Sequence, residues 1–468
     1  MKKEAKKAKE AKKKSPIKKI ILFGLLALAV VITAYFLISG YVDGLPNIRY
    51  DGYTGEAAAA QYPDSSFAVI SDIHFYDKSL GTGGAAFEEV LYSDRKLLLD
   101  SEDLLDYTIE ELLGSDIQFV LVSGDLTKDG ERINHDKVAA KLQQLVDGGI
   151  KVFVVPGNHD VNNPYGAVSF SGDEMTPVAY ISAEDFAAIY KNMGYGDALM
   201  RDEHSLSYVA EPVDGLWILG IDACRYRENQ PDEEEIVGGR ITQESAEWMA
   251  DVLGQAVDRN KAVIVLIHQG LMEHWDGQAK LHPDYIVEDF KYFGEFLASY
   301  NVRLGFTGHY HAQDVTRAEF DIKGTKKALH DIETGSLITA PCPIRYCSIS
   351  KNTLNIRTNS IVDKLHPGTD FAENALSFVK ETVYREAYST LKNYKVSDDD
   401  ADYIADLVGE AFAVHYSGDE DASLRVAADT SKLSLWGRVV YSTQVYVLDG
   451  LWNDLAPADN NVVIDLAA

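Results

Sequence analysis

Five short polar motifs, each placed directly after a run of apolar residues, constrain this chain more than any other feature. In chain order they are Asp72-Ile73-His74, Gly124-Asp125, Gly157-Asn158-His159-Asp160, His268 and Gly308-His309-Tyr310-His311. The apolar runs are short and rich in β-branched residues, which is typical of strands covered on both faces. Helical patterns lie between them, so the sequence predicts a layered α/β protein whose strands end at the motifs.

The side chains of these motifs suit a metal site. They are carboxylates, imidazoles and an amide, with no cysteine. Such donors favour borderline-hard divalent ions, Mn²⁺ or Fe²⁺ first and Zn²⁺ as the alternative. Open α/β sheets hold ligands at the carboxyl ends of their strands, so we expect these side chains to meet there. Each motif alone is a common turn or core feature, but all five in order indicate one shared site.

The charge of the chain is unevenly distributed. Residues 1–19 contain ten Lys and two Glu, a net charge of +8. Since the whole chain carries −29, the remaining residues carry −37. A body this acidic repels polyanions, so duplex nucleic acid is excluded as a partner. A small phosphorylated molecule, neutralised by metal ions, is still compatible with this charge.

Residues 20–40 form an uncharged apolar segment that predicts a membrane anchor. At about 1.5 Å per residue, a helix of this length spans roughly 31 Å, which matches a bilayer core. The lysine-rich residues 1–19 are expected to stay in the cytoplasm, with the C-terminal body outside the cell. A cleaved signal peptide is the alternative, but its apolar core usually has only ~7–15 residues and ends at small residues.

The remaining composition predicts the domain limits. Residues 41–64 read as a linker and residues 65–365 as the layered core, with a long helix expected over 84–113. Apolar residues recur at helical spacing from Phe371 to Leu391, and two more helices are expected over 401–413 and 434–450. We therefore expect a helical domain at 366–468. Cys342 and Cys347 are close enough in sequence to pair, although buried free thiols are the expected state.

On these motifs the chain resembles the calcineurin-like metallophosphoesterase superfamily. The signature D-x-H, G-D-x4-G, G-N-H-[DE], H, G-H-x-H is met without a gap, including the spacing from Asp125 to Gly130. The resemblance implies a four-layer αββα sandwich and a catalytic domain at 65–365. In overall layout the chain is similar to the membrane-tethered class III cyclic-nucleotide phosphodiesterases of Gram-positive bacteria, which implies a surface enzyme of such a cell.

The resemblance also implies the ligands of two metal ions. The first would be held by Asp72, His74, Asp125 and His311, and the second by Asp125, Asn158, His268 and His309. Asp125 would then bridge the ions. Two ions of this kind are expected to share a hydroxide that attacks phosphorus, so that no Ser or Cys nucleophile is needed.

Three further residues are assigned roles around this centre. His159 adjoins Asn158 but is not a ligand, and it is placed to protonate the departing alkoxide as the general acid. Asp160 is expected to orient its ring. Asn158, His159 and Tyr310 are expected to contact the substrate.

The sequence leaves the substrate open. A cyclic or other small nucleotide is favoured, and a phosphomonoester or a phospholipid or pyrophosphate-linked envelope precursor is the alternative. A non-catalytic metal-binding module is disfavoured because every ligand is present. Solvated or structural roles are expected for the remaining candidates, which are Asp77, Asp129, Arg225, Arg227, His274 and His282, and no role is assigned to His135, His204, His330, His366 and His415.

Overall fold

The computed structural model describes residues 46–55 and 61–467. The chain divides into two compact units, Met1–Arg49 and Tyr50–Ala468, and the second contains every helix and strand given below. The predicted basic tail and membrane segment lie outside the described residues. Among those that are described, no helix combines the length and the apolar character needed to cross a bilayer.

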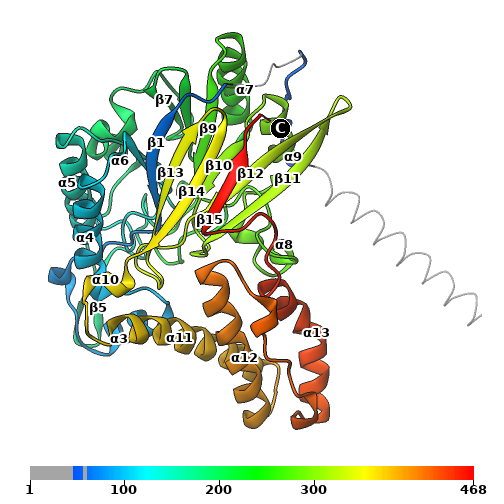
Figure 1. Ribbon diagram of the computed structural model, residues 1–468. Helices are drawn as coiled ribbons and strands as arrows, with labels where there is room; N and C mark the ends of the chain where they lie inside the picture. Colours follow the sequence, from blue (N-terminus) through cyan, green and yellow to red (C-terminus); the bar gives the residue numbers. More distant parts are fainter. Residues whose placement is uncertain (1–45, 56–60, 468) are drawn as a thin grey trace, which may run out of the picture. The chain divides into compact units, whose positions relative to one another are not determined.

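The first sheet contains six strands in the order β15-β14-β13-β1-β2-β3 (Figure 1). Their bounds are β1 (Ser65–Ile70), β2 (Phe119–Val122), β3 (Lys151–Val154), β13 (Pro343–Ser350), β14 (Thr353–Ser360) and β15 (Asn461–Asp465). Strands β1, β2 and β3 are parallel, whereas β13, β14 and β15 pair in antiparallel fashion. The parallel strands are almost wholly buried, as their β-branched runs predict.

The second sheet contains seven strands in the order β11-β12-β10-β9-β8-β7-β6. Their bounds are β6 (Met200–Arg201), β7 (Tyr208–Val213), β8 (Leu216–Ile221), β9 (Ala262–Ile267), β10 (Leu304–Thr307), β11 (Asp314–Ile322) and β12 (Thr325–Glu333). Strands β8, β9 and β10 are parallel. A separate hairpin, β4 (Val168–Ser171) with β5 (Glu174–Pro177), lies in the segment after the Gly-Asn-His-Asp motif.

The two sheets pack on each other with helices outside them. Phe67 of β1 meets Phe306 of β10 edge to face, with ring centroids 5.5 Å apart. Helix α5 (Arg132–Asp147) packs on β3 and on α4 (Ser101–Leu113), while α7 (Gln243–Asp258) packs on β9 and α9 (Phe290–Ser299) on β11 and β12. The core therefore has the helix, sheet, sheet, helix layers of the mixed α/β fold that the sequence predicts. The shorter helices are α3 (Ala85–Ser93), α6 (Ala183–Ile189), α8 (Gln278–Leu281) and α10 (Val362–Leu365).

Three helices follow the sheets, close to their expected positions. They are α11 (Phe371–Asn393), α12 (Asp398–Ser417) and α13 (Leu435–Leu451). Leu391, Ile404, Leu433 and Val440 belong to a small apolar core of their own. The chain then returns to the first sheet, where β15 pairs with β14, so the segment expected to be helical ends in a strand. The domain limit at 365 stays a prediction.

Three local expectations differ from the structure, and one open alternative is settled as expected. The helix expected over 84–113 is broken between Ser93 and Leu98. The nine-residue strands β11 and β12 form a hairpin where no strands were expected. Tyr62, in the expected linker, is buried and donates its hydroxyl to the Val263 carbonyl at 3.1 Å. Cys342 and Cys347 are buried free thiols, so the alternative of a disulfide is excluded.

Candidate metal centre

The seven predicted ligands follow the parallel strands of both sheets and meet at one edge. Asp72 and His74 follow β1, Asp125 follows β2, Asn158 follows β3, His268 follows β9, and His309 and His311 follow β10. All seven side chains are buried. Parallel strands present their carboxyl ends together, which is why residues 240 positions apart in the sequence become neighbours.

One group of donors surrounds the first predicted ion. The Nε2 atoms of His74 and His311 are 3.2 Å apart, and His311 Nε2 lies 3.3 Å from Asp72 Oδ1. Asp72, His74 and His311 each turn one donor atom into this common volume. Two ligand atoms bound to one ion at about 2.1 Å are separated by roughly 3.0–3.4 Å, so the spacing fits a shared metal.

A second group surrounds the other predicted ion. His268 Nε2 lies 3.2 Å from both Asp125 Oδ2 and Asn158 Oδ1. The rings of His268 and His309 are 4.6 Å apart between centroids, and Asp125, His268 and His309 form a second convergent donor set.

Asp125 lies between the two groups. Its Oδ2 is 3.5 Å from His74 Nε2 on one side and 3.2 Å from His268 Nε2 on the other. Burial raises the pKa of Asp125, but the imidazoles of His268, His159 and His74 hold it well below the usual range. A carboxylate that stays ionised between two donor groups has the position of a bridging ligand.

The hydrogen bonds around these side chains leave the donor atoms open toward the centre. Ser71 donates its hydroxyl to Asp72 Oδ2 at 2.5 Å, and no described residue forms a hydrogen bond with Asp72 Oδ1. His268 Nδ1 is 2.7 Å from the Ser123 carbonyl, which fixes the tautomer and leaves Nε2 as a ligand atom. Burial lowers the pKa of His309 to about 3, so its ring is neutral and able to coordinate. The residues fit a pair of divalent ions.

The backbone that places the ligands is strained. The φ values are +50° at Asp72, +38° at His74, +48° at Asp125, +79° at His309 and +67° at His311. Non-glycine residues rarely adopt positive φ, and such strain concentrates at functional sites. The ligands thus reach the two predicted ion positions from left-handed loop conformations rather than from extended strands.

His159 lies beside the donors with its ring held by carboxylates. Its Nδ1 is 2.7 Å from Asp129 Oδ1 and 3.2 Å from Glu235 Oε1, and its Nε2 is 3.9 Å from Asp125 Oδ2. Burial lowers the pKa of His159, but Glu235, Asp125 and the bond to Asp129 raise it to about 10. The ring therefore presents Nε2 to the centre.

The expectation that Asp160 orients this ring is wrong. The Asp160 carboxylate accepts hydrogen bonds from the backbone of Leu126, Thr127 and Gly157 and from the Thr127 hydroxyl. It ties the two ligand loops together instead. Asp129, expected only to shape its loop, and Glu235, which the sequence did not single out, hold His159. Glu235 lies in the loop between β8 and α7, and nothing in the sequence relates that loop to His159.

Arg95 and Lys96 were also missed by the sequence analysis. They lie in the break between α3 and α4. Lys96 is buried, its Nζ is 2.8 Å from Asp94 Oδ2, and its charge lowers the pKa of His74 after the larger effect of burial. Arg95 pairs with Glu386 of α11 at 2.9 Å. Reading 84–113 as one continuous helix concealed both residues.

The residues expected to have solvated or structural roles differ in their surroundings. Arg225 pairs with Glu228 and Glu288, and Arg227 lies over the ring of Tyr226, so neither is aimed at a phosphate. His274 is not a surface residue: it is buried among Asp314, Asp331 and Glu333.

Tyr310, expected to contact the substrate, is buried between His309 and His311. Its ring packs near the rings of Phe412, His415 and Tyr416, all of α12. The residue therefore connects the ligand loop to the C-terminal helices.

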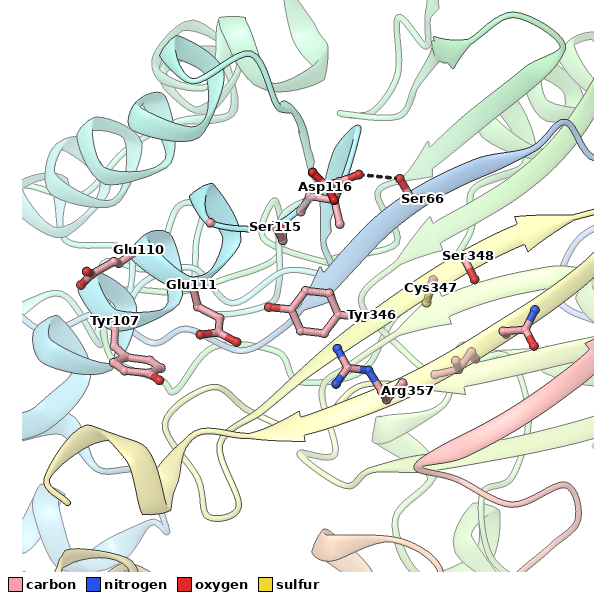
Figure 2. A pocket seen from close by; sticks show the side chains of 14 residues that line it. Ser66, Tyr107, Glu110, Glu111, Ser115, Asp116, Tyr346, Cys347, Ser348 and Arg357 are labelled. Carbon is pink, nitrogen blue, oxygen red and sulfur yellow. Dashed lines mark hydrogen bonds between the residues drawn. The ribbon is translucent and has the colours of Figure 1, made fainter. Parts of the chain in front are cut away.

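Two cavities differ in their relation to the centre. A cavity of about 660 Å³, shown in Figure 2, lies against β13, β14 and the end of α4, and its lining includes Glu111, Tyr346 and Arg357 but none of the predicted site residues. A second cavity of about 330 Å³ is lined by Tyr285, Tyr310 and residues of α11, α12 and α13. We call the second one the apolar pocket.

The profile of the calcineurin-like phosphoesterase family matches residues 65–313, more than half of the chain. The chain belongs to this family. The family implies metal-dependent phosphoester hydrolysis at a dinuclear divalent centre, and the described residues hold histidine and carboxylate groups suited to one.

Solved structures similar to this chain include a dimetal phosphatase from Danio rerio, with 16% identity over 64% of this chain and 97% of the other, at a TM-score of 0.44. A purple acid phosphatase from yellow lupin (Lupinus luteus) seeds is 13% identical over 66% of this chain and 52% of its own, at a TM-score of 0.37. No match was found among curated proteins.

Proposed function

We propose that this chain is a phosphodiesterase that uses two divalent ions. One observation carries the proposal: two groups of buried donors converge on opposite sides of the Asp125 carboxylate. Asp72, His74, Asp125 and His311 would hold one ion, and Asp125, Asn158, His268 and His309 the other. Mn²⁺ or Fe²⁺ is favoured and Zn²⁺ is the alternative, because the donors are imidazole, carboxylate and amide groups.

When bound, the ions would supply the Lewis acidity that polarises phosphoryl oxygens and activates water. The chain itself supplies the acid. His159 carries a proton on Nε2 toward the centre, while Asp129 and Glu235 stabilise the imidazolium from the Nδ1 side. It would give this proton to the leaving oxygen, so that an alkoxide does not have to depart as an anion.

The charges around the site favour a diester over a monoester. Arg95 and Lys96 are each paired with a carboxylate, Glu386 and Asp94. Asp129 and Glu235 add negative charge beside His159. A phosphodiester carries one negative charge, whereas a monoester carries nearly two at neutral pH, and the added charge is less compatible with this surrounding.

Substrate and location are proposals that begin from the sequence. A cyclic or other small nucleotide follows from the resemblance to class III phosphodiesterases. Attachment to a cell membrane through residues 20–40, with the catalytic unit outside the cell, follows from the charge and apolar pattern of the N-terminal segment. Both are tested by experiment rather than by the fold.

The proposal is tested with the full-length chain supplied with Mn²⁺. We expect hydrolysis of bis-p-nitrophenyl phosphate to exceed that of p-nitrophenyl phosphate. Asp125→Asn should lose both ions and His311→Ala one of two, as measured by elemental analysis, and both should lose most activity. His204→Ala, an exposed histidine outside the site, is the matched control and should keep two ions. Full metal content in Asp125→Asn would refute the bridging role.

A further inference from the structure

The apolar pocket is built mainly by the C-terminal helices. Val383 of α11, Ile404 and Val408 of α12, and Val440, Val447 and Leu448 of α13 contribute aliphatic side chains to its lining. Its volume of about 330 Å³ falls within the range of small-molecule sites, roughly 300–1,000 Å³. The helices that follow the family's core thus enclose a cavity with an aliphatic wall.

This pocket adjoins the predicted metal centre. Tyr285 lines the pocket, and its ring centroid is 4.7 Å from that of His309, a predicted ligand. Tyr310, the residue after His309, lines the same pocket and packs on α12. A molecule bound at the centre would therefore reach the pocket after passing one aromatic ring.

The lining also contains polar groups, which are Arg95, Glu386, His282, Thr390, Gln444 and the hydroxyls of Tyr285, Tyr310, Tyr394 and Tyr441. Arg95 and Glu386 form an ion pair at 2.9 Å across its wall, and Thr390 and Gln444 stand at exposed positions. Ten of the twenty lining residues are nevertheless aliphatic, Leu391 and Val445 among them. An aliphatic chain needs no hydrogen-bond partner and gains about fourfold in affinity for each buried methylene.

Large apolar side chains are exposed at the start of α13, the helix that also supplies part of the pocket lining. Leu435 and Trp436 at the start of α13 are 81% and 51% exposed, and Val439 lies one turn further on. Trp436 donates its ring N–H to the carbonyl of Tyr394, a pocket residue, at 3.0 Å. Exposed apolar patches beside a binding cavity mark contact with a partner or a membrane, and an indole at such a place suits a lipid–water interface.

We infer that the apolar pocket holds the aliphatic chain of a lipid phosphodiester whose phosphate lies at the metal centre. The inference rests on the proposed phosphodiesterase function and, of the two substrate classes that the sequence leaves open, favours the lipid over the nucleotide. The juxtaposition that carries it is a largely aliphatic cavity whose Tyr285 ring lies against the ring of His309 and whose Tyr394 accepts a hydrogen bond from the exposed Trp436. The enzyme would take its substrate at a membrane surface against which the start of α13 lies.

The test uses the full-length chain in phosphatidylcholine nanodiscs with Mn²⁺. The probes are p-nitrophenyl alkyl phosphates with methyl, butyl and octyl groups. We expect kcat/KM to rise with chain length, the octyl ester exceeding the methyl ester by at least about tenfold.

Two adjacent residues provide the matched variants. Thr390 lines the pocket, whereas Ser389, also exposed, does not. Thr390→Trp should bring the octyl-to-methyl ratio close to one, and Ser389→Trp should keep the ratio of the parent chain. Since both variants share the same nanodiscs, partition of the octyl ester into lipid affects them equally. Ala387→Trp, one turn before Leu391 on the same helix, gives a second obstruction.

The outcomes separate the inference from the proposed function. No hydrolysis of bis-p-nitrophenyl phosphate by the parent chain would refute the phosphodiesterase itself. Hydrolysis with a flat chain-length profile would overturn the lipid inference and leave the enzyme in place. A Thr390→Trp variant that changes KM for a cyclic nucleotide while keeping the chain-length profile would overturn it in favour of a nucleotide pocket.

Discussion

The Nδ1 atom of His159 lies 2.7 Å from Oδ1 of Asp129, a residue thirty positions earlier in the chain. This contact, rather than any with the adjacent Asp160, determines which ring nitrogen faces the ligand carboxylate of Asp125. Asp129 therefore holds the ring of the proposed general acid, whereas Asp160 holds the ligand loops together.

Removal of the acid should depend on the leaving group. His159→Ala is expected to lower kcat by roughly 10²–10⁴ for an alkoxide leaving group. For p-nitrophenolate, which departs without a proton, the loss should be below about tenfold. Kinetics on an alkyl diester and on bis-p-nitrophenyl phosphate measure the difference, with metal content as the control. Equal losses on both substrates, or loss of metal, would show that His159 acts in another way.

Substitution by asparagine should lower catalytic activity at Asp129 and thermal stability at Asp160. Asp129→Asn is expected to lower kcat by about 10–100-fold with both ions retained, because the ring of His159 loses its charged partner. Asp160→Asn should instead lower the melting temperature, since its amide cannot accept all of the four hydrogen bonds that the carboxylate receives, at about 1–3 kcal/mol per unsatisfied group. Calorimetry and kinetics on the two variants check this. A thermally unchanged Asp160→Asn with low activity would restore the original assignment.

Gly157 should be indispensable to the centre. A Cβ added there would lie 2.0 Å from Oδ1 of Asp125, so Gly157→Ala must displace the bridging carboxylate. We expect loss of both ions in elemental analysis. Gly254→Ala on α7 is the control: its Cβ meets no atom within 4 Å, and it should raise stability by about 0.5–1 kcal/mol. Full metal content in Gly157→Ala would contradict the geometry.

The buried His274 should make stability depend on pH. Burial lowers its pKa, but Glu333, Asp331 and Asp314 outweigh this and hold it well above the usual 6.5. A histidine whose pKa is higher in the folded than in the unfolded chain stabilises the fold, and this contribution is complete when the pH is below the pKa of the unfolded chain. It falls by about 1.4 kcal/mol per pH unit as the pH rises from that value toward the pKa of the folded chain. The parent chain should therefore exceed His274→Gln in melting temperature most at pH 6. The difference should shrink toward pH 9, and a constant difference would show that His274 is neutral.

Much of the fold follows from local sequence signals. The runs before Asp72, Asp125, His268 and His309 are strands of the expected kind, because a parallel strand buried on both faces must be almost wholly apolar. The segment from Thr325 to Glu333 mixes charged and apolar residues, and its hairpin with β11 turns at Lys323 and Gly324, a less recognisable pair than Asn-Gly. Strand β15 depends on a partner a hundred residues away, which no local pattern reveals.

In the candidate site, too, some features could be predicted from the sequence and others could not. The donor types could be predicted from metal chemistry, and the assignment of the ligands was implied by the resemblance to the metallophosphoesterase superfamily. Their left-handed backbone could not, since Asp72 and His74 look like the end of an ordinary strand. The roles of Asp129, Glu235 and Lys96 come from loops that meet only in the folded chain. Charge contacts of this kind leave no spacing in the sequence.

The chain leaves the first sheet at Ser360, the end of β14, and re-enters it at Asn461, the start of the neighbouring strand β15. The intervening hundred residues are consequently an insertion whose two ends lie on neighbouring strands. Replacing them by a short loop, or by the equivalent stretch of another chain, would disturb none of the strands that carry the ligands. Selectivity for the organic part of a phosphoester could thus be exchanged while the hydrolytic chemistry is kept.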